Sequence, residues 1–263
     1  MKRNFLLLAV MMFALSPVLS AQEPTVRSLF NGTNLDGWNF KAGDRVNTWT
    51  VGRLASNTVE EAATTMEPLP LRGGPGAGTR GGGAGAPAGA GLGASGVMIN
   101  ATGNDWRDAR RGVDIYTTER FGDVTVRLEF LVLRRGNSGV YMMGEYELQI
   151  ADSFGRPSDR MGPGDMGGIW ATAAPRVNAA GAPGTWQSLE IEFVAPRFDA
   201  EGNKTANAIF KRVVLNGILI QENVEVQGST GGGLTGREHA TGPIMFQGDH
   251  GPVAFRNIEV IVP

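Results

Sequence analysis

The chain has 263 residues, with 24 Lys and Arg side chains against 26 Asp and Glu, and it contains no cysteine. Because the net charge is only −2 and no basic run occurs, nucleic acid is not expected as a partner. The lack of thiols excludes disulfides, a lipid-bearing cysteine and thiolate zinc sites, so the core itself must stabilise the fold.

The N-terminal segment has the pattern of a secretory signal peptide. Lys2 and Arg3 precede an apolar run over residues 5–15, and small residues follow up to Ala21. The run is shorter than the roughly 18 to 20 residues that span a bilayer, and no later stretch is long and apolar enough to do so. We therefore expect residues 1–21 to be removed, the mature chain to stay out of the membrane, and the protein to be periplasmic or secreted.

Residues 72–96 consist mainly of glycine, with alanine and proline. Such a composition cannot bury enough apolar surface to offset the entropy lost on ordering, so the segment is predicted to be a flexible surface insertion. It contains a Gly-x-Gly-x-x-Gly match, but no strand precedes it and no helix follows. A dinucleotide site is therefore not expected there.

The rest of the chain is organised as short segments of alternating polarity, the period of half-buried strands. Residues 123–133, for example, alternate valine, leucine and phenylalanine with Thr125, Arg127 and Glu129. Asn216-Gly217 lies between two apolar runs and predicts a tight hairpin, because both residues tolerate positive φ. No amphipathic helix of three or more turns is visible, so we predict an all-β fold of two packed sheets. The expected strands cover residues 123–133, 146–150, 189–194, 208–215, 217–226, 244–246 and 255–262.

Several phrases, taken in order, resemble one known family. LFNG at 29–32 and LDGW at 35–38 are similar to the opening signature of the 3-keto-disaccharide hydrolase domain family. The resemblance implies a concanavalin-A-like jelly-roll β-sandwich of two packed antiparallel sheets, forming a single domain over residues 22–263 apart from the insertion. It also implies an exported role in carbohydrate breakdown. The further phrases are FGD at 121–123, RLEF at 127–130, GNSGVY at 136–141, YELQI at 146–150, GTWQ at 184–187, GPI at 242–244 and FRNI at 255–258.

Two phrases depart from the family pattern. The usual Gly-Ala-Ile-Tyr-Gly is GGIWA at 167–171, and the usual Leu-Gln-Asp-His-Gly is FQGDHG at 246–251. The second phrase contains an extra residue, Gly248, immediately before Asp249 and His250. A shift in the register of these two side chains is therefore an expectation to test.

Three polar residues are the first candidates for the site. Glu147 and Gln149 lie on the side of their strand opposite its apolar residues, so both point away from the core if the apolar side enters it. His250 is one of two histidines and lies in a turn between strands, and imidazole transfers protons near neutral pH. The alternatives are a solvated sheet face for the first two and a surface turn capped by Asp249 for His250.

Further candidates come from other parts of the chain. The planar fork of Arg256 could hold an anionic or enolate oxygen, and an inward salt bridge, for example to Glu129, is its alternative. Asn137 could donate to sugar hydroxyls or cap a turn. Trp170, in a loop after two glycines, is the preferred side chain for stacking on a sugar ring. The tryptophans expected in the core are Trp38, Trp49 and Trp186.

The resemblance implies cleavage of 3-keto-glycosides. A ketone at C3 makes the hydrogen on C2 acidic, so a base forms an enolate, the group at C1 leaves, and water addition completes a net hydrolysis. Such a site needs a base, a donor for the enolate oxygen and an acid for the leaving oxygen. We expect Glu147, His250 and Arg256 in these roles, without an assignment among them. The residues expected to bind the saccharide are Asn137, Gln149, Trp170, Gln247 and Asp249.

Two other functions stay open. In a two-carboxylate glycosidase, Glu147 would pair with Asp152 or Glu129, although the E-x-D-x-E ladder of sandwich glucanases is absent. A non-catalytic carbohydrate-binding module is the second alternative, because one sandwich hosts both enzymes and lectins. Convergence of the candidate side chains in one pocket would favour an enzyme. The sequence requires no cofactor, a divalent metal is possible, and the oligomeric state is open.

Overall fold

The computed structural model describes residues 24–41, 43, 45–54, 66–68, 96–100 and 112–263. The expected signal peptide at 1–21 and residues 72–95 of the expected insertion lie outside the described residues. The described part consists of strands and loops, with one 3₁₀ turn, η1, at Ser158–Arg160. It contains no helix with the length and apolar character needed to cross a membrane.

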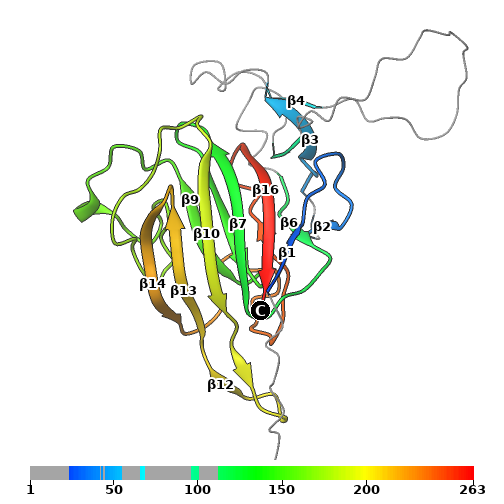
Figure 1. Cartoon of the computed structure of the whole chain (residues 1–263), viewed down its shortest axis with the longest axis vertical. Helices are drawn as coiled ribbons and strands as arrows, with labels where there is room; N and C mark the ends of the chain where they lie inside the picture. Colours follow the sequence, from blue (N-terminus) through cyan, green and yellow to red (C-terminus); the bar gives the residue numbers. More distant parts are fainter. Residues whose placement is uncertain (1–23, 42, 44, 55–65, 69–95, 101–111) are drawn as a thin grey trace, which may run out of the picture.

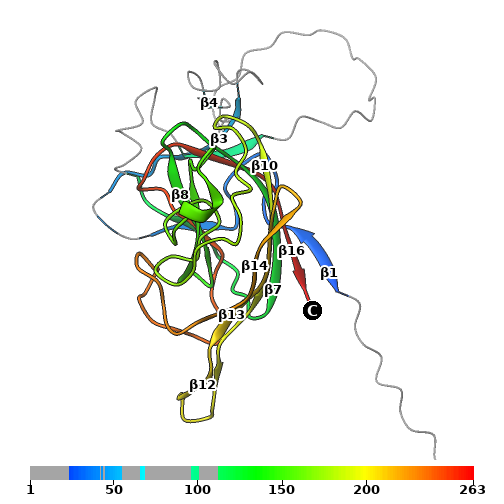
Figure 2. The same cartoon turned by 90° about the vertical axis from the view of Figure 1, so that its left-hand side faces the viewer.

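Two antiparallel sheets pack face to face, which confirms the predicted all-β sandwich (Figure 1). Figure 2 shows the two layers from the side, with the larger sheet on the right. Within the described residues the larger sheet has nine strands and the smaller has five.

The order across the larger sheet is β14 (Ile218–Val226), β13 (Ala208–Leu215), β10 (Gln187–Val194), β7 (Val124–Val132), β16 (Val253–Val262), β5 (Val97–Asn100), β3 (Trp49–Leu54) and β4 (Met66–Pro68), while β1 (Thr25–Ser28) also pairs with β16. The order across the smaller sheet is β2 (Trp38–Phe40), β6 (Ile115–Thr117), β15 (Met245–Phe246), β8 (Asn137–Met142) and β9 (Tyr146–Ala151). A hairpin of β11 (Arg197–Phe198) and β12 (Lys204–Ala206) projects from one end (Figure 1).

The predicted alternation sets which side of each strand is buried. In β7, Leu128 and Phe130 enter the core, whereas Arg127, on the opposite side of the same strand, faces solvent. Asn216 and Gly217 have φ of +51° and +80° and join β13 to β14, which confirms the predicted hairpin.

A stack of aromatic rings joins the two sheets near the end that carries the candidate site. Phe246 of the smaller sheet stacks on Phe255 of the larger at 4.1 Å between ring centroids, and Trp38 and Trp49 extend the stack on either side. Both tryptophans are buried in the core, as predicted. The stack fixes β15, and the turn that follows β15 contains the candidate histidine.

Trp186 is not in this core, which corrects the expectation for it. It is half-buried and packs against a small cluster on the outer face of the larger sheet, formed by Val97, Ile99, Leu131 and Ala254. The reason is the period of two in β10: Gln187 and Leu189 are buried on the inner side, so the preceding residue points outward.

Candidate active site

The outer face of the smaller sheet carries a row of polar side chains. In β9 the alternate residues enter the core, so Glu147 and Gln149 project from the opposite face, as the alternation predicts. Across the sheet, Tyr141 of β8 is opposite Glu147, and Gly139 is opposite Gln149. On the other side of β8, the backbone N–H of Gln247 donates to Gly139 O at 3.0 Å.

Glu147 is only 3% exposed, and its carboxyl group lies over Gly139. A Cβ at Gly139 would lie 2.9 Å from Glu147 Cγ and 3.0 Å from Cδ, so a side chain there would displace the carboxyl group from this position. When the Gln149 amide nitrogen is oriented to donate to Ser138 O at 2.7 Å, it also donates to Glu147 Oε1 at 3.3 Å. The Glu147 backbone N–H donates to Thr230 Oγ1 at 3.0 Å.

Burial raises the pKa of Glu147 to about 7, because the carboxylate loses its hydration. Interaction with the Tyr141 hydroxyl, which itself donates to Gly231 O at 3.1 Å, and the charge of His250 lower this pKa, whereas the negative charges of Asp114 and Asp249 raise it. Near neutral pH such a group exists in both protonation states, as a general base or acid requires.

The imidazole of His250 is held by its neighbour Asp249. Nδ1 of His250 is hydrogen-bonded to Asp249 Oδ1, and the other oxygen of Asp249 pairs with Arg45. The bond to Asp249 raises the pKa of His250, burial opposes this, and the charges of Asp249, Glu147 and Asp114 reinforce it. Because Nδ1 is engaged with Asp249, Nε2 is the nitrogen that can transfer a proton to a substrate.

The carboxyl group of Asp249 is suited to this orienting role. Burial alone would raise its pKa, but hydrogen bonds from His250 and Arg45 outweigh burial and hold the pKa below its usual range. Asp249 therefore stays ionised and stabilises the protonated imidazole.

The extra Gly248 is accommodated by tight packing of the turn. A Cβ at this position would lie 2.8 Å from Trp49 Nε1 and closer still to Val113 O, so a side chain is excluded. Gly248 N donates to Asp114 Oδ1 at 2.9 Å, and Asn100 Nδ2 donates to Gly248 O at 2.8 Å. The insertion thus leaves the following histidine within electrostatic range of the buried glutamate.

Trp170 lies beside Glu147 and is 39% exposed. Its backbone N–H donates to Glu147 O at 3.1 Å. Its ring packs on two glycines, since a Cβ at Gly164 would lie 3.0 Å from Cζ3 and a Cβ at Gly231 3.2 Å from Nε1. The loop therefore presents a partly exposed aromatic side chain close to β9, an arrangement suited to stacking on a sugar ring.

Gln247 is buried, and its Oε1 has no hydrogen-bond partner among the described residues. The backbone of Gln247 is fixed, because Ser138 Oγ donates to its carbonyl at 2.8 Å. A buried polar atom without a partner is costly, so this acceptor suits a ligand that supplies a donor. Asn137 is close to the same turn, because a Cβ at Gly251 would lie 3.8 Å from Asn137 O.

Sequence reasoning missed three residues of this site. Tyr141 alternates with Gly139 along one strand, so the period of two contained a signal for it. Asp114 and Lys41 form an ion pair, with 3.2 Å between Nζ and Oδ2, just outside β6 and β2. No sequence signal identifies this pair, because the pairing of β2 with β6 joins segments about seventy residues apart.

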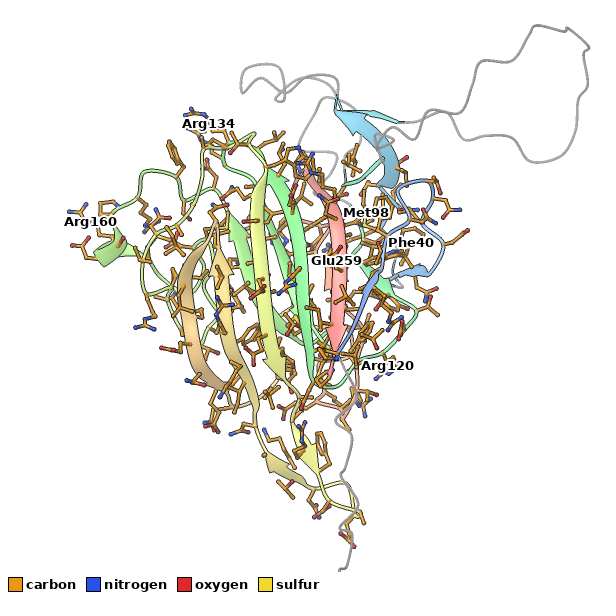
Figure 3. The ribbon with its side chains drawn as sticks, in the orientation of Figure 1. Phe40, Met98, Arg120, Arg134, Arg160 and Glu259 are labelled. Carbon is orange, nitrogen blue, oxygen red and sulfur yellow. The ribbon has the colours of Figure 1, made fainter. Side chains whose placement is uncertain are left out.

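Arg256 lies elsewhere, which corrects the expectation that it joins the site. It is on the outer face of the larger sheet, the face seen in Figure 3 around Glu259 of the same strand. Its Nε is 2.6 Å from Glu129 Oε2, and its guanidinium lies 4.0 Å from the Trp186 ring centroid. Phe255 enters the core, so the next side chain points away from the smaller sheet. The expected partner Glu129 is confirmed, but the ion pair lies on the outer face and not inward.

Other carboxylates near β9 have structural partners. The carboxylate of Glu145 accepts bonds from Thr235 N at 2.8 Å, Thr235 Oγ1 at 2.7 Å and Gly236 N at 3.0 Å. Asp152 accepts a bond from Arg135 N at 2.8 Å and so caps a turn. Within the described ranges, no three His, Asp or Glu side chains are arranged to hold a metal ion.

The family model of the 3-keto-alpha-glucoside-1,2-lyase-like domain matches residues 25–261, nearly the whole chain. The chain belongs to this family. It is therefore a carbohydrate-active enzyme of the hydrolase or lyase type.

Two solved structures resemble this chain in fold. Both come from Parabacteroides distasonis, and each is described as a "putative glycosyl hydrolase". The first has a TM-score of 0.58 and 21% identity, covering 94% of this chain and 93% of that chain. The second has a TM-score of 0.50 and 17% identity, covering 89% and 92%. Comparison with curated protein sequences found no significant match.

Proposed function

We propose that the protein is an exported enzyme that cleaves 3-keto-glycosides by proton abstraction at C2, loss of the C1 group and addition of water. The observation that carries the proposal is the buried carboxyl group of Glu147, which lies over Gly139 and has a raised pKa of about 7. The charge of His250, whose ring is held by Asp249, acts on this group, so the two residues can serve as base and acid. Export is supported by the N-terminal sequence pattern.

Glu147 acts as the base. The C2–H bond breaks, its proton moves to the carboxylate, and its electron pair forms an enolate with the C3 ketone. The positive imidazolium of His250 stabilises the negative charge that develops next to it. The enolate then re-forms the ketone as the C1–O bond breaks, which leaves a C1=C2 double bond.

His250 acts as the acid. Its Nε2 proton goes to the oxygen that leaves C1, while Asp249 keeps the ring oriented through Nδ1. Water then adds across the double bond, with its hydroxyl at C1 and a proton at C2. The sum is hydrolysis of the glycosidic bond, with the ketone unchanged.

We also assign residues that bind the saccharide near Glu147. The free acceptor of Gln247 suits a sugar hydroxyl, and the exposed Trp170 suits an apolar sugar face or a ring of the leaving group. Gln149 donates to Glu147 and so helps to hold the carboxylate toward the substrate. A buried carboxyl group that accepts from Gln149 and feels the charge of His250 supports an enzyme over a non-catalytic sugar-binding module, although Arg256 does not join these residues.

The test is an assay of purified protein with a 3-keto-glucoside and the matching unoxidised glucoside, each with and without a chelator. Release of the leaving group from the 3-keto substrate alone is the expected result. Glu147→Gln should abolish release, whereas Glu190→Gln on the outer face of the other sheet should not. Cleavage of the unoxidised glucoside would support an ordinary glycosidase, and binding without cleavage would support a lectin-like module. The chelator arms report metal dependence.

A further inference from the structure

Lys41 and Asp114 connect the two loops that border Glu147. Lys41 Nζ lies 3.2 Å from Asp114 Oδ2 and donates to Gly232 O at 2.8 Å. The other oxygen of Asp114 accepts the backbone N–H of Gly248 at 2.9 Å. The ion pair therefore joins the turn at Gly232 to the turn at Gly248 through two side chains.

Each of these turns controls one partner of Glu147. Gly248 is followed directly by Asp249 and His250. Gly232 packs on the Tyr141 hydroxyl, because a Cβ there would lie 2.6 Å from Tyr141 Oη. Movement of the Gly248 turn would change the distance from the Glu147 carboxyl group to His250. Movement of the Gly232 turn would change its distance to Tyr141 Oη.

We propose that Lys41 and Asp114 are positioning residues that fix His250 and Tyr141 around Glu147. The catalytic consequence rests on the proposed function, whereas the placement of His250 does not. Asp114 is nearly buried, so loss of the Lys41 charge leaves a carboxylate without its cation beside the Gly248 turn. The turn must then shift or admit water.

The position of His250 can be read from its titration. The charged or titratable groups around it are Asp249, Glu147 and Asp114; Arg45 pairs with the other oxygen of Asp249, and Lys41 pairs with Asp114. Removal of the Lys41 charge by itself would raise the pKa of His250, because a positive neighbour is lost. Loosening of the contact with Asp249 would lower it, because that bond is the main reason for the raised pKa. The two explanations therefore predict shifts of opposite sign.

The experiment is an NMR titration of the imidazole signals, for which the chain is favourable because it has only two histidines. His239 serves as the internal reference. The variants are Lys41→Met, Lys41→Gln and Lys41→Arg, with Lys204→Met as the matched control. Lys204 has the same kinds of partner, the Gln227 carbonyl at 2.6 Å and a Glu238 oxygen at 2.8 Å.

We expect the pKa of His250 to fall in Lys41→Met and Lys41→Gln and to stay near the wild-type value in Lys41→Arg and Lys204→Met. With a 3-keto-glucoside, kcat should fall about 100-fold in the first two variants, the loss expected when a catalytic group moves by about 1 Å. Lys41→Arg should restore most of it.

A raised or unchanged pKa of His250 in Lys41→Met or Lys41→Gln, whichever is folded, would overturn the proposal. Lys41→Arg retains the cation, so a fall in its His250 pKa equal to that of Lys41→Met would overturn it too. If the wild-type protein cleaves no 3-keto-glucoside, the proposed function fails. The titration would still decide the positioning role.

Discussion

The side chain of Glu147 occupies the space that a side chain at Gly139 would take. The Cβ position of Gly139 is 2.9 Å from Glu147 Cγ and 3.0 Å from Cδ. Real Cβ atoms do not approach carbon this closely, so the absence of a side chain on β8 determines where the carboxyl group of β9 lies. The glycine is thus part of the geometry of the site.

Gly139→Ala should displace the Glu147 carboxyl group with little loss of stability. Gly139 does not have a positive φ, so alanine is compatible with its backbone, and the flexible Glu147 side chain can move. We expect kcat/KM for a 3-keto-glucoside to fall about 100-fold. The control is Gly228→Ala, where a Cβ meets nothing within 4 Å. Equal activity of the two variants would show that the carboxyl group is not used where it lies.

Tyr141→Phe should move the acidic limb of the pH profile to higher pH. Glu147 must be ionised to accept a proton, so kcat/KM should rise as pH passes its pKa of about 7. Interaction with the Tyr141 hydroxyl lowers this pKa, so removal of the hydroxyl should raise it. The measurement is kcat/KM against pH for both proteins. An acidic limb that stays in place would assign it to another group.

The basic limb should belong to His250, whose raised pKa keeps the acid protonated over a wider range. The rate should therefore fall as pH rises through that pKa, and His250→Gln should remove this limb. A basic limb that persists in the variant would contradict the role of His250 as the acid.

Glu147→Gln should stabilise the protein increasingly as pH rises. The folded-state pKa is raised from 4.5 to about 7, so below pH 4.5 both states are protonated and ionisation costs nothing. Above pH 7 the folded protein bears the full cost of a buried carboxylate, about 3 kcal/mol. Urea unfolding at pH 5 and pH 8 measures the difference.

Glu190→Gln provides the contrast for this measurement. Burial raises the pKa of Glu190, but bonds from Arg127 and Arg212 outweigh it and leave a lowered pKa. The stabilisation that the ionised Glu190 gives to the folded state is therefore already present at pH 5 and does not grow toward pH 8. If the two variants respond alike to pH, the assigned burial of Glu147 is wrong.

Arg256→Gln should leave catalysis nearly unchanged. Its ion pair with Glu129 and its position over Trp186 are on the sheet remote from the site. We expect kcat/KM to change by about 2-fold or less, which is about 0.4 kcal/mol. The unfolding free energy should fall by about 1 kcal/mol. A large loss of kcat/KM at unchanged stability would show that Arg256 takes part in catalysis.

The sequence contained most of the information on the strands and on one face of the site. Alternation along residues 146–150 is a local property, so it correctly placed Glu147 and Gln149 away from the core. The same reasoning would have placed Arg256 on an outer face. It could not tell which sheet that face belonged to, because sheet membership depends on long-range pairing.

The missed residues have the same physical origin. Lys41, Asp114 and Gly248 meet only because β2, β6 and β15 are neighbours in one sheet. Trp186 was assigned to the core because it lies in a phrase that resembles the family pattern, whereas the period of two in β10 put it outside. The orphan acceptor of Gln247 depends on what its neighbours leave unpaired, which no local pattern contains.

The most direct test of the central claim is the fate of hydrogen at C2 when a 3-keto-glucoside is cleaved in D₂O. Proton abstraction by Glu147 followed by water addition should put deuterium at C2 of the sugar product. Spontaneous enolisation exchanges both C2 and C4, since both adjoin the ketone, so C4 and a sample of product without enzyme are the controls. Enrichment at C2 far above C4, lost in Glu147→Gln, is the result we predict. Retention of the original hydrogen at C2 in the cleaved product would contradict the mechanism.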